Sequence, residues 1–373
     1  SGNWPIMVCS RRKRLALGAI PLIHAEHVVR VADLLDAIGV PADRYLERSR
    51  ISPRVREDPS VFVPGYAVWR LVGESNRGEH LGEFWLDIAQ IANWRRAAWV
   101  RPLTRAATLQ DAIRAMCSSY VQQIPMIEMG LTVDGPVAWF WRRHVVDTKD
   151  WTGSESAERY TLSFMLEVVR AAAGPAWLPD CLKVECSPSG WSAATSRLPG
   201  VRFEHDRPLL AVPIPVPMLS LPVSITAHSR AAGELEAPAI DLQGSLRQVI
   251  EPWLTTGLLT QEIAAEMLGT TPRTLRRRLA EENTSWQAVL NDLKFEKAVA
   301  RLQEGRSSVR EVAEELGYSV PAHFSRFFRT RAGVPPSAYR EEVERARELA
   351  GQPALPIQTT SSIPGSSMSL KGQ

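Results

Sequence analysis

Apolar residues at helical spacing dominate the first hundred positions of the chain. The first such run predicts a helix over residues 28–38, and its apolar residues are Val28, Val31, Leu34, Leu35 and Ile38. Gly39 follows directly, and glycine commonly ends a helix. The same spacing predicts further helices near 42–48, 65–74, 81–92 and 108–122.

Alternation of apolar and polar residues replaces the helical spacing further along. The apolar positions are Ile127, Met129, Leu131 and Val133, then Val137, Trp139 and Trp141. Asp134-Gly135 lies between the two runs and predicts the tight turn of a hairpin. A helix near 156–172 and strands near 182–186, 201–204 and 209–212 are expected to follow. The first two hundred residues are therefore predicted to be α+β, with helices first and then a small, mostly antiparallel sheet.

Changes in composition predict the domain boundaries. Prolines in 213–222 exclude a central strand and favour an extended exit from the first domain, because proline lacks the backbone donor. Residues 224–240 are small and polar and predict a linker. The end of the chain from Gly351 is rich in Pro, Ser, Thr and Gly and predicts a disordered tail. The expected parts are a flexible lead (1–20), a first domain (21–223), a linker (224–240), an all-α domain (241–345) and a tail (346–373).

An internal repeat in the all-α part carries the strongest functional signal. The first copy runs from Ile263 to Gly269 and continues with an apolar pair, Leu275 and Leu279. The second copy has the same order of residues, with one extra position in its turn: Val312 to Gly317, then Phe324 and Phe328. Two copies of one short pattern indicate two copies of one supersecondary unit.

The residue types in each copy are those of a helix-turn-helix. Glycine after the first helix takes the left-handed conformation that ends it, and Thr271 and Ser319 are placed to cap or lead into the second helix. Pro272 suits the first position of a helix, and the apolar pair attaches that helix to the core. Between the copies, residues 286–304 predict a linker helix of about 28 Å, which approaches the ~34 Å repeat of the DNA duplex.

The face opposite each apolar pair is the expected DNA contact surface. Arginine there can bind guanine in the major groove or hold a phosphate. The alternative is a solvated helix face on which arginine serves only solubility. The candidate DNA-binding residues are Thr271, Arg273, Thr274, Arg276 and Arg277 in the first copy, and Ser319, Val320, Ala322, His323, Ser325 and Arg326 in the second.

Overall composition limits the possible functions but does not identify one. The chain has 373 residues with 45% hydrophobic and 23% charged residues and a net charge of only +3, so the basic character is local. The sequence contains no run of 18 apolar residues, so it predicts no membrane-spanning helix. The basic run before Leu15 resembles a signal peptide, but Pro21 and His24 interrupt its apolar part, so a cytoplasmic location is favoured.

Catalytic and metal-binding patterns are missing from the sequence. It holds no phosphate-loop, dinucleotide or Gly-x-Ser-x-Gly motif, so we expect no enzyme activity and no cofactor. His24 and His27 are the one histidine pair with helical spacing, and surface or partner contacts are favoured over a metal there. The four cysteines are read as reduced structural thiols, with Cys181 and Cys186 on opposite faces of one strand.

The second copy and the residues after it resemble the AraC/XylS type of transcription regulator. The motif is Leu316-Gly317-Tyr318-Ser319, then Ala322 to Phe328, then Gly333 to Arg340, and the resemblance covers about 245–343. Residues 33–40 and 201–222 are similar to the effector domain of the branch with ornithine-utilisation and acid-resistance regulators. The resemblance implies a bacterial, sequence-specific DNA-binding regulator whose N-terminal domain senses an effector.

Three departures from the family pattern bear on DNA recognition. Asn283 stands where glycine is usual, and asparagine tolerates the same left-handed backbone. Lys294 replaces the usual arginine of the linker helix. Residues 319–322 are poor in hydrogen-bond donors, so the first unit is expected to make more of the base-specific contacts.

Tryptophans are the candidates for an effector site. Ten of the twelve lie before residue 225, and a tryptophan-lined cavity suits a small ligand, although core packing was the alternative. The candidates are Trp94, Trp99, Trp139 and Trp141.

The expected partners are promoter double-stranded DNA, a small-molecule effector, a second copy of the chain, and RNA polymerase if the protein is an activator. Two alternatives are a ligand-independent or architectural DNA-binding protein whose first domain only dimerises, and, less favoured, an enzyme fused to a DNA-binding domain.

Overall fold

The structure is a computed structural model that describes residues 7–8, 19–79, 81–82, 84–146, 151–191, 195–228, 238–239, 241–256 and 259–350. The chain forms two compact units. One comprises Ser1–Trp253 and Leu259–Val289, and the other Leu254–Leu258 and Leu290–Gln373. Most of the predicted linker, 224–240, and the tail after residue 350 lie outside the described residues.

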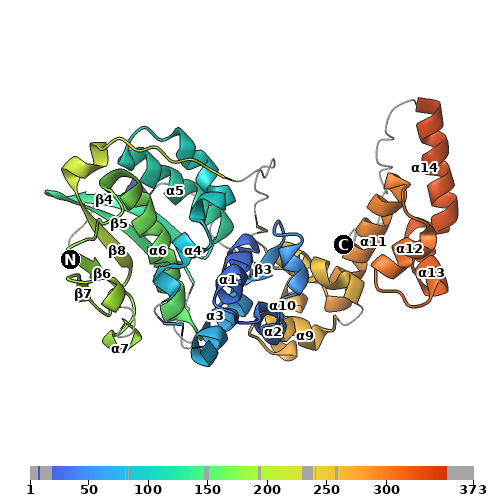
Figure 1. Cartoon of the computed structure of the whole chain (residues 1–373). Coiled ribbons are helices and arrows are strands. Elements are labelled where there is room, and N and C mark those ends of the chain that lie inside the picture. The colour runs from blue at the N-terminus through green and yellow to red at the C-terminus, as the bar shows by residue number, and fades with distance from the viewer. Residues whose placement is uncertain are drawn as a thin grey trace, which may run out of the picture. The chain divides into compact units, whose positions relative to one another are not determined.

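The first unit begins with a helical lobe (Figure 1). Its elements are β2 (Leu22–His24), α1 (Glu26–Ala37), α2 (Ala42–Arg48), β3 (Phe62–Pro64) and α3 (Gly65–Glu79). Strands β2 and β3 pair antiparallel. The three predicted helices are confirmed, and α3 continues beyond the expected end at residue 74.

The helix predicted over 81–92 was wrong. The chain forms a 3-10 turn at Phe84–Leu86, a single turn α4 at Ile88–Ile91, and further 3-10 turns at Trp94–Arg96 and Ala98–Arg105. The N–H groups of Phe84 and Asp87 bond to the carbonyls three residues back, of Leu81 and Phe84, rather than to those four residues back, so no continuous α-helix forms. The apolar residues are buried through these short turns rather than along one helix face.

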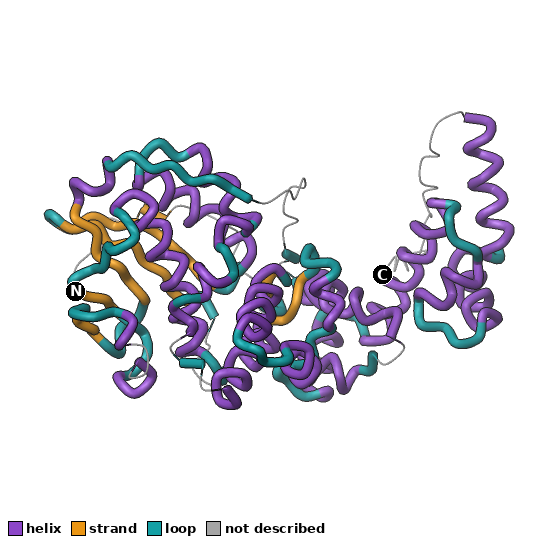
Figure 2. The backbone as a smooth tube through the Cα atoms, viewed as in Figure 1, coloured by secondary structure: helices purple, strands orange, loops and turns teal. Residues whose placement is uncertain are grey.

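A mixed sheet forms the second lobe of this unit. Its order is β1-β4-β5-β8-β6-β7, and all pairs are antiparallel except β6 with β7. The strands are β1 (Met7–Val8), β4 (Ile127–Asp134), β5 (Val137–His144), β6 (Cys181–Lys183), β7 (Arg202–Glu204) and β8 (Leu210–Pro215). Figure 2 shows the strands gathered in one layer with helices packed on it. The expected combination of helices and a small, mostly antiparallel sheet is confirmed, and Met7–Val8 belong to the sheet rather than to a flexible lead.

Two helices cover one face of the sheet. They are α5 (Leu109–Gln123) and α6 (Ser154–Ala173), and both were predicted within a few residues. Thr108 and Asp111 form a capping box at the start of α5. Phe140 of β5, Tyr120 of α5 and Phe164 of α6 are fully buried between these layers.

The hairpin is confirmed with a shifted turn. Asp134 pairs with Val137, so the two residues of the turn are Gly135 and Pro136 rather than Asp134 and Gly135. Gly135 has a φ of 56°, the positive value that such a turn requires.

Strand β8 overturns the expectation that prolines keep 213–222 out of the sheet. Pro213 pairs with Trp139 and Pro215 with Val137, and β8 lies between β5 and β6. Val216 donates its N–H to Pro136 O on the β5 side. Because successive N–H groups alternate, the two prolines fall on the opposite side, where β6 is in register only with Ala211. The missing donors are therefore not needed for pairing with β5.

Cys181 and Cys186 do not share a strand, contrary to the prediction. Strand β6 ends at Lys183. The buried Glu158 carboxylate then accepts the N–H of Glu185 at 2.5 Å and that of Cys186 at 3.3 Å. These side-chain contacts replace the strand ladder at Cys186.

The remaining helices divide between the two units. The first unit also contains α7 (Pro188–Trp191), α8 (Leu242–Ile250), α9 (Gln261–Met267) and α10 (Pro272–Glu281). Helix α11 (Trp286–Glu304) crosses the boundary between the units. The second unit continues with α12 (Val309–Glu315), α13 (Pro321–Ala332) and α14 (Pro336–Ala350). Of the helices described, none is long and apolar enough to cross a membrane.

Candidate nucleic-acid interface

Helices α9 and α10 form the first of the two expected helix pairs. Gly269 follows α9 with a φ of 62°, and the N–H of Thr270 reaches back to Ala265 O at 2.9 Å. Thr271 caps α10, because its Oγ1 accepts the N–H of Thr274 at 3.1 Å. Pro272 is the first residue of α10. The turn residues therefore act as the sequence predicted.

The two faces of α10 differ in exposure as expected. Leu275 is 1% exposed and Leu279 0%. Arg273, Arg276 and Arg277 are exposed on the other side of the helix. Arg277 also pairs with Glu281 of its own helix at 2.8 Å, a contact that an exposed arginine exchanges readily for another anion.

Helices α12 and α13 form the second pair. Ser308 and Glu311 make a capping box at α12, and Gly317 follows that helix with a φ of 75°. The N-cap of α13 is Val320, whose side chain has no oxygen to act as a cap, so Ser319 leads into the helix without capping it. Phe324 and Phe328 are 0% exposed and hold α13 to its neighbours.

The outer face of α13 is less basic than that of α10. Val320 is 43% exposed, and Ala322, His323 and Arg326 are exposed beside it. His323 and Arg326 also line an open hollow of about 380 Å³. Ser325 is half-buried. Arg326 is thus the one arginine among the candidate residues on this helix.

Neighbouring basic residues have structural contacts. Arg331 pairs with Asp292 at 2.5 Å and lies over the rings of Phe295 and Phe327. Lys294 Nζ lies 4.4 Å from the ring centre of Tyr318, and burial lowers its pKa. Asn283 has a φ of 55°, so it takes the left-handed backbone expected of it.

The first helix pair contacts the helical lobe within the same compact unit. Glu266 of α9 accepts from Arg50 Nε and from Arg70 NH1, each at 3.0 Å. The ring of Tyr66 lies against Gly269, and a Cβ on that glycine would be 2.5 Å from the ring. Helix α3 supplies both Tyr66 and Arg70, so it links the lobe to the turn of the first pair. No pattern of neighbouring residues predicts this contact, because the partners lie about two hundred positions apart along the chain.

The four candidate tryptophans fall into two groups. Trp94 and Trp99 are 4% and 0% exposed and stack within the core, where Trp99 also contacts Tyr120 and Phe164. Trp139 and Trp141 lie on the sheet face away from Phe140 and line an open hollow of about 430 Å³. Lys183 Nζ is 3.5 Å from the ring centre of Trp139.

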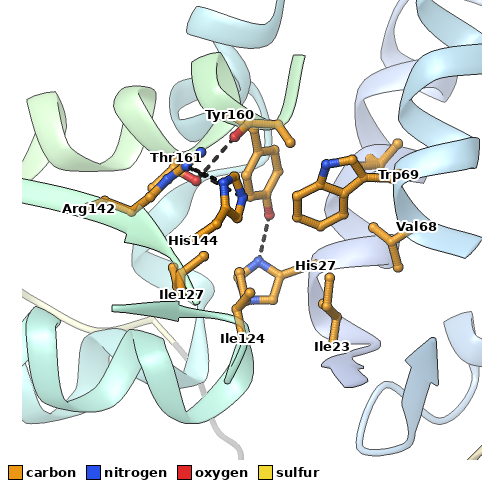
Figure 3. Close-up of a pocket in the computed structure, with 12 residues that line it drawn as sticks. Ile23, His27, Val68, Trp69, Ile124, Ile127, Arg142, His144, Tyr160 and Thr161 are labelled. Carbon is orange, nitrogen blue, oxygen red and sulfur yellow. Dashed lines mark hydrogen bonds between the residues drawn. The ribbon is translucent and has the colours of Figure 1, made fainter. Parts of the chain in front are cut away.

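Sequence reasoning missed a small, largely apolar cavity between the two lobes (Figure 3). Four of the residues around it have polar side chains: His27 of α1, Arg142 and His144 of β5, and Tyr160 of α6. His27 Nδ1 and Tyr160 OH share a hydrogen bond of 2.8 Å, and Arg142 NH1 donates to Glu185 at 2.6 Å. A signal was present, because Arg142 continues the inward phase of Ala138 and Phe140 along β5.

Burial determines the protonation of the two histidines around this cavity. It lowers the pKa of His27 well below its ordinary value, and the neighbouring Arg30 lowers it further. Burial and Arg142 likewise lower the pKa of His144, against the opposite effect of Glu185. Both rings are therefore neutral near pH 7. Within the described residues, no group of three or more His, Cys, Asp or Glu side chains could hold a metal ion.

Comparison with known proteins identifies the C-terminal part of the chain. Residues 264–342 match the family described as a helix-turn-helix domain. A helix-turn-helix transcriptional regulator of Mycobacterium bovis, itself uncharacterised, is 46% identical over 68 residues, which are 18% of this chain and 20% of that protein. The ornithine utilization regulator of Pseudomonas aeruginosa is 39% identical over 80 residues, which are 21% of this chain and 24% of that protein.

A match among solved structures is the transcriptional regulator CdpR from Pseudomonas aeruginosa. It is 20% identical and has a TM-score of 0.35, and the match covers 81% of this chain and 96% of that one. The two sequence matches span only a fifth to a quarter of the relatives' lengths.

Proposed function

We propose that this chain, whose residues 264–342 belong to the AraC type of helix-turn-helix family, is a sequence-specific DNA-binding regulator of transcription. The observation that carries the proposal is the exposed face of α10, where Arg273, Arg276 and Arg277 stand opposite the buried Leu275 and Leu279. Proteins named as transcriptional regulators are not enzymes, and the proposal assigns no catalysis to the chain.

The proposal assigns DNA reading to both helix pairs. Each recognition helix, α10 and α13, would enter a major groove with its exposed face. The boundaries proposed for the DNA-binding domain are residues 241–345. Thr271, Thr274, Ser319 and Ser325 would contribute hydroxyl contacts to phosphates or bases.

The two helices would differ in what they read. A bidentate arginine–guanine pair discriminates by about 1–3 kcal/mol, and α10 presents three exposed arginines that can form one. On α13, Val320 and Ala322 suit contact with thymine methyl groups, and His323 and Arg326 suit polar contact. The first unit would therefore supply more of the base preference.

We also propose that the N-terminal domain controls DNA binding in response to a small effector. The contacts of Arg50, Tyr66 and Arg70 with the first helix pair support this, because a shift of α3 would move Glu266 and Gly269 directly. Trp139 and Trp141 at the open hollow remain candidates for effector contact, and the close packing of Trp94 and Trp99 favours a core role for them. The protein would act in the cytoplasm as a homodimer on promoter DNA, with RNA polymerase as a further partner of an activator.

Binding of the full chain to a library of randomised duplexes tests the proposal. Enrichment of a defined site is expected, with affinity that falls steeply as salt rises, because each neutralised phosphate contributes about −0.9 to the log–log slope. Equal binding of all sequences would favour the architectural alternative. Failure to bind duplex DNA at low salt would contradict the proposed function altogether.

A further inference from the structure

The open hollow lined by Trp139 and Trp141 results from the order of side chains across the sheet. Ala211 of β8 pairs with Trp141 of β5 on one side and with Lys183 of β6 on the other. Side chains of directly paired residues point to the same face of a sheet, so a methyl group lies between two long side chains. The depression that results has a volume of about 430 Å³, within the range of sites for small ligands.

The aromatic wall of the hollow is already in place. The ring of Trp141 lies against Gly130 of β4, where a Cβ would be 2.5 Å from it. Its Nε1 donates to Thr132 Oγ1 at 2.9 Å, and the side chain is 6% exposed. Trp139, two positions earlier on the same face, is half-buried and lines the hollow. A wall that needs no ordering favours a flat ligand that stacks on it.

The charged lining of the hollow favours an anion. It consists of three basic residues and one acidic residue: Arg143, Lys183, Arg207 and Glu204. Arg143 pairs with Glu128, and Arg207 pairs with Glu204. Lys183 has no acidic partner among the residues that the structure describes, and its Nζ lies over the ring of Trp139. Because a cation–π contact is weaker than a charge-assisted hydrogen bond, an anion would draw Lys183 off the ring and free that surface for stacking.

The ring of Trp139 and the guanidinium of Arg207 belong to different ends of the hollow. Trp139 pairs with Pro213 of β8, and Leu209 lies four residues before Pro213, which is about 13 Å along an extended chain. Arg207 precedes Leu209 by two residues, and both line the hollow. A ligand that contacts both Trp139 and Arg207 is therefore elongated. A single ring with a charged group attached directly to it is too short for both contacts.

From this arrangement we propose that the hollow binds a nucleoside monophosphate as the effector. The base stacks on Trp139, as nucleic-acid bases do on aromatic side chains. The phosphate accepts from Lys183 Nζ and from Arg207, whose five donors hold Glu204 as well. A phosphate monoester carries about 1.5–2 negative charges at pH 7, which suits a predominantly basic lining. The term effector rests on the proposed function, and the binding site itself does not.

Strand β5 connects the hollow to the first helix pair. Trp139 and Trp141 of this strand line the hollow, and the ring of His144 at its end lies 5.8 Å from that of Trp69 of α3. The next residue of α3, Arg70, donates to Glu266 of α9. A ligand that stacks on β5 thus acts on an element in contact with α3, and α3 holds the turn of the first helix pair.

Calorimetric titration of the full chain with the monophosphates of adenosine, guanosine, cytidine and uridine tests the inference. We expect at least one of them to bind about tenfold or more tightly than its nucleoside, because the nucleoside lacks the group that pairs with Lys183 and Arg207. Inorganic phosphate should also bind about tenfold or more weakly, because it lacks the ring that stacks on Trp139. Equal binding of the nucleotide and either of these probes would show that the assignment is wrong.

Two substitutions of identical chemistry locate the phosphate. Arg207 and Arg202 are both exposed and close in sequence, but only Arg207 lines the hollow. Arg207→Gln should weaken nucleotide binding about fivefold or more, and Arg202→Gln should change it less than about twofold. Lys183→Gln should weaken binding as Arg207→Gln does. Equal affinity of the Arg207→Gln and Arg202→Gln proteins would place the ligand elsewhere and overturn the assignment.

Two substitutions of Trp139 test the stacking of the base. Trp139→Leu removes the aromatic ring and should weaken binding about tenfold, whereas Trp139→Phe keeps a ring and should stay within about threefold of the unsubstituted protein. Thermal melting checks that both variants are folded. Equal losses in the two folded variants would mean that the side chain does not act by stacking, and the nucleotide assignment would be wrong.

DNA selection separates this inference from the proposed function. If no nucleoside monophosphate binds a folded chain that still selects a DNA site, the inference is wrong and the regulator proposal stands. If the nucleotide binds but the chain selects no DNA site, the regulator proposal fails and the binding site stands. Nucleotide binding that leaves the affinity for the selected DNA unchanged would overturn the assignment of the nucleotide as the effector.

Discussion

Arg70 of α3 donates to Glu266 of α9 over 3.0 Å, and the residue before it, Trp69, lines the buried cavity. Adjacent residues of α3 thus face the buried interior and the first helix pair. Arg50 binds the other oxygen of Glu266, also at 3.0 Å, so that carboxylate joins α9 to two segments of the helical lobe.

Glu266→Gln should uncouple effector binding from DNA binding. The ion pairs are partly exposed, so the loss of unfolding free energy should stay below about 1 kcal/mol. The ratio of DNA affinities with and without effector should fall toward one, as measured by gel shift. Glu128→Gln removes a comparable exposed pair, with Arg143, and should leave that ratio unchanged. An unchanged ratio in Glu266→Gln would show that the junction does not transmit the signal.

Gly269→Ala should be more destabilising than Gly333→Ala. Both glycines have positive φ, 62° and 78°, so both changes introduce a strained backbone that costs about 1 kcal/mol. Only Gly269 faces a ring at 2.5 Å, whereas a Cβ at Gly333 meets nothing within 4 Å. Chemical denaturation of the two variants should separate the steric cost from the backbone cost. Equal losses would mean that the Tyr66 ring moves away freely.

Arg276→Ala or Arg277→Ala should relax base preference in one half of the DNA site. A lost bidentate contact to guanine lowers discrimination by about 1–3 kcal/mol at that position. Selection from randomised duplexes measures the effect, with Arg44→Ala on the exposed side of α2 as the control. Uniform weakening for all sequences would instead assign these arginines to phosphates.

Protein stability should fall as pH drops below about 6.5. Burial lowers the pKa of His24, His27 and His144 in the folded protein. The unfolded chain then binds protons that the folded chain does not, so unfolding is favoured on the acidic side of the ordinary histidine pKa. Each such histidine contributes up to about 1.4 kcal/mol per pH unit. Melting temperatures between pH 5 and 8 should therefore show a shallower decline in His27→Asn than in the unsubstituted protein, and parallel curves would argue against this origin.

The local features of the helix pairs could be predicted from the sequence because neighbouring residues determine them. Thr271 caps the helix that follows it, Gly269 ends the helix that precedes it, and Leu275 with Leu279 is buried by spacing alone. Ser319 precedes α13 without capping it, because the helix begins one residue later than at the equivalent place in the first pair.

The small buried cavity and the junction at Glu266 depend on contacts between distant segments. His27 and Tyr160 are separated by 133 positions, and Arg70 and Glu266 by 196, so no periodic pattern in the sequence predicts either contact. The helix expected over 81–92 failed for a related reason. Its apolar residues are buried on several sides, and a pattern of one buried face cannot represent that environment.

The two prolines of β8 have a consequence for how the protein behaves at high concentration. Beyond Ala211 the outer side of β8 is not covered by β6, and an uncovered strand invites pairing with another chain. Pro213 and Pro215 remove the donors on that side, so an incoming strand would find carbonyl groups alone and could not form a ladder. The same residues that complicate the sequence pattern thereby protect this sheet from edge-to-edge aggregation.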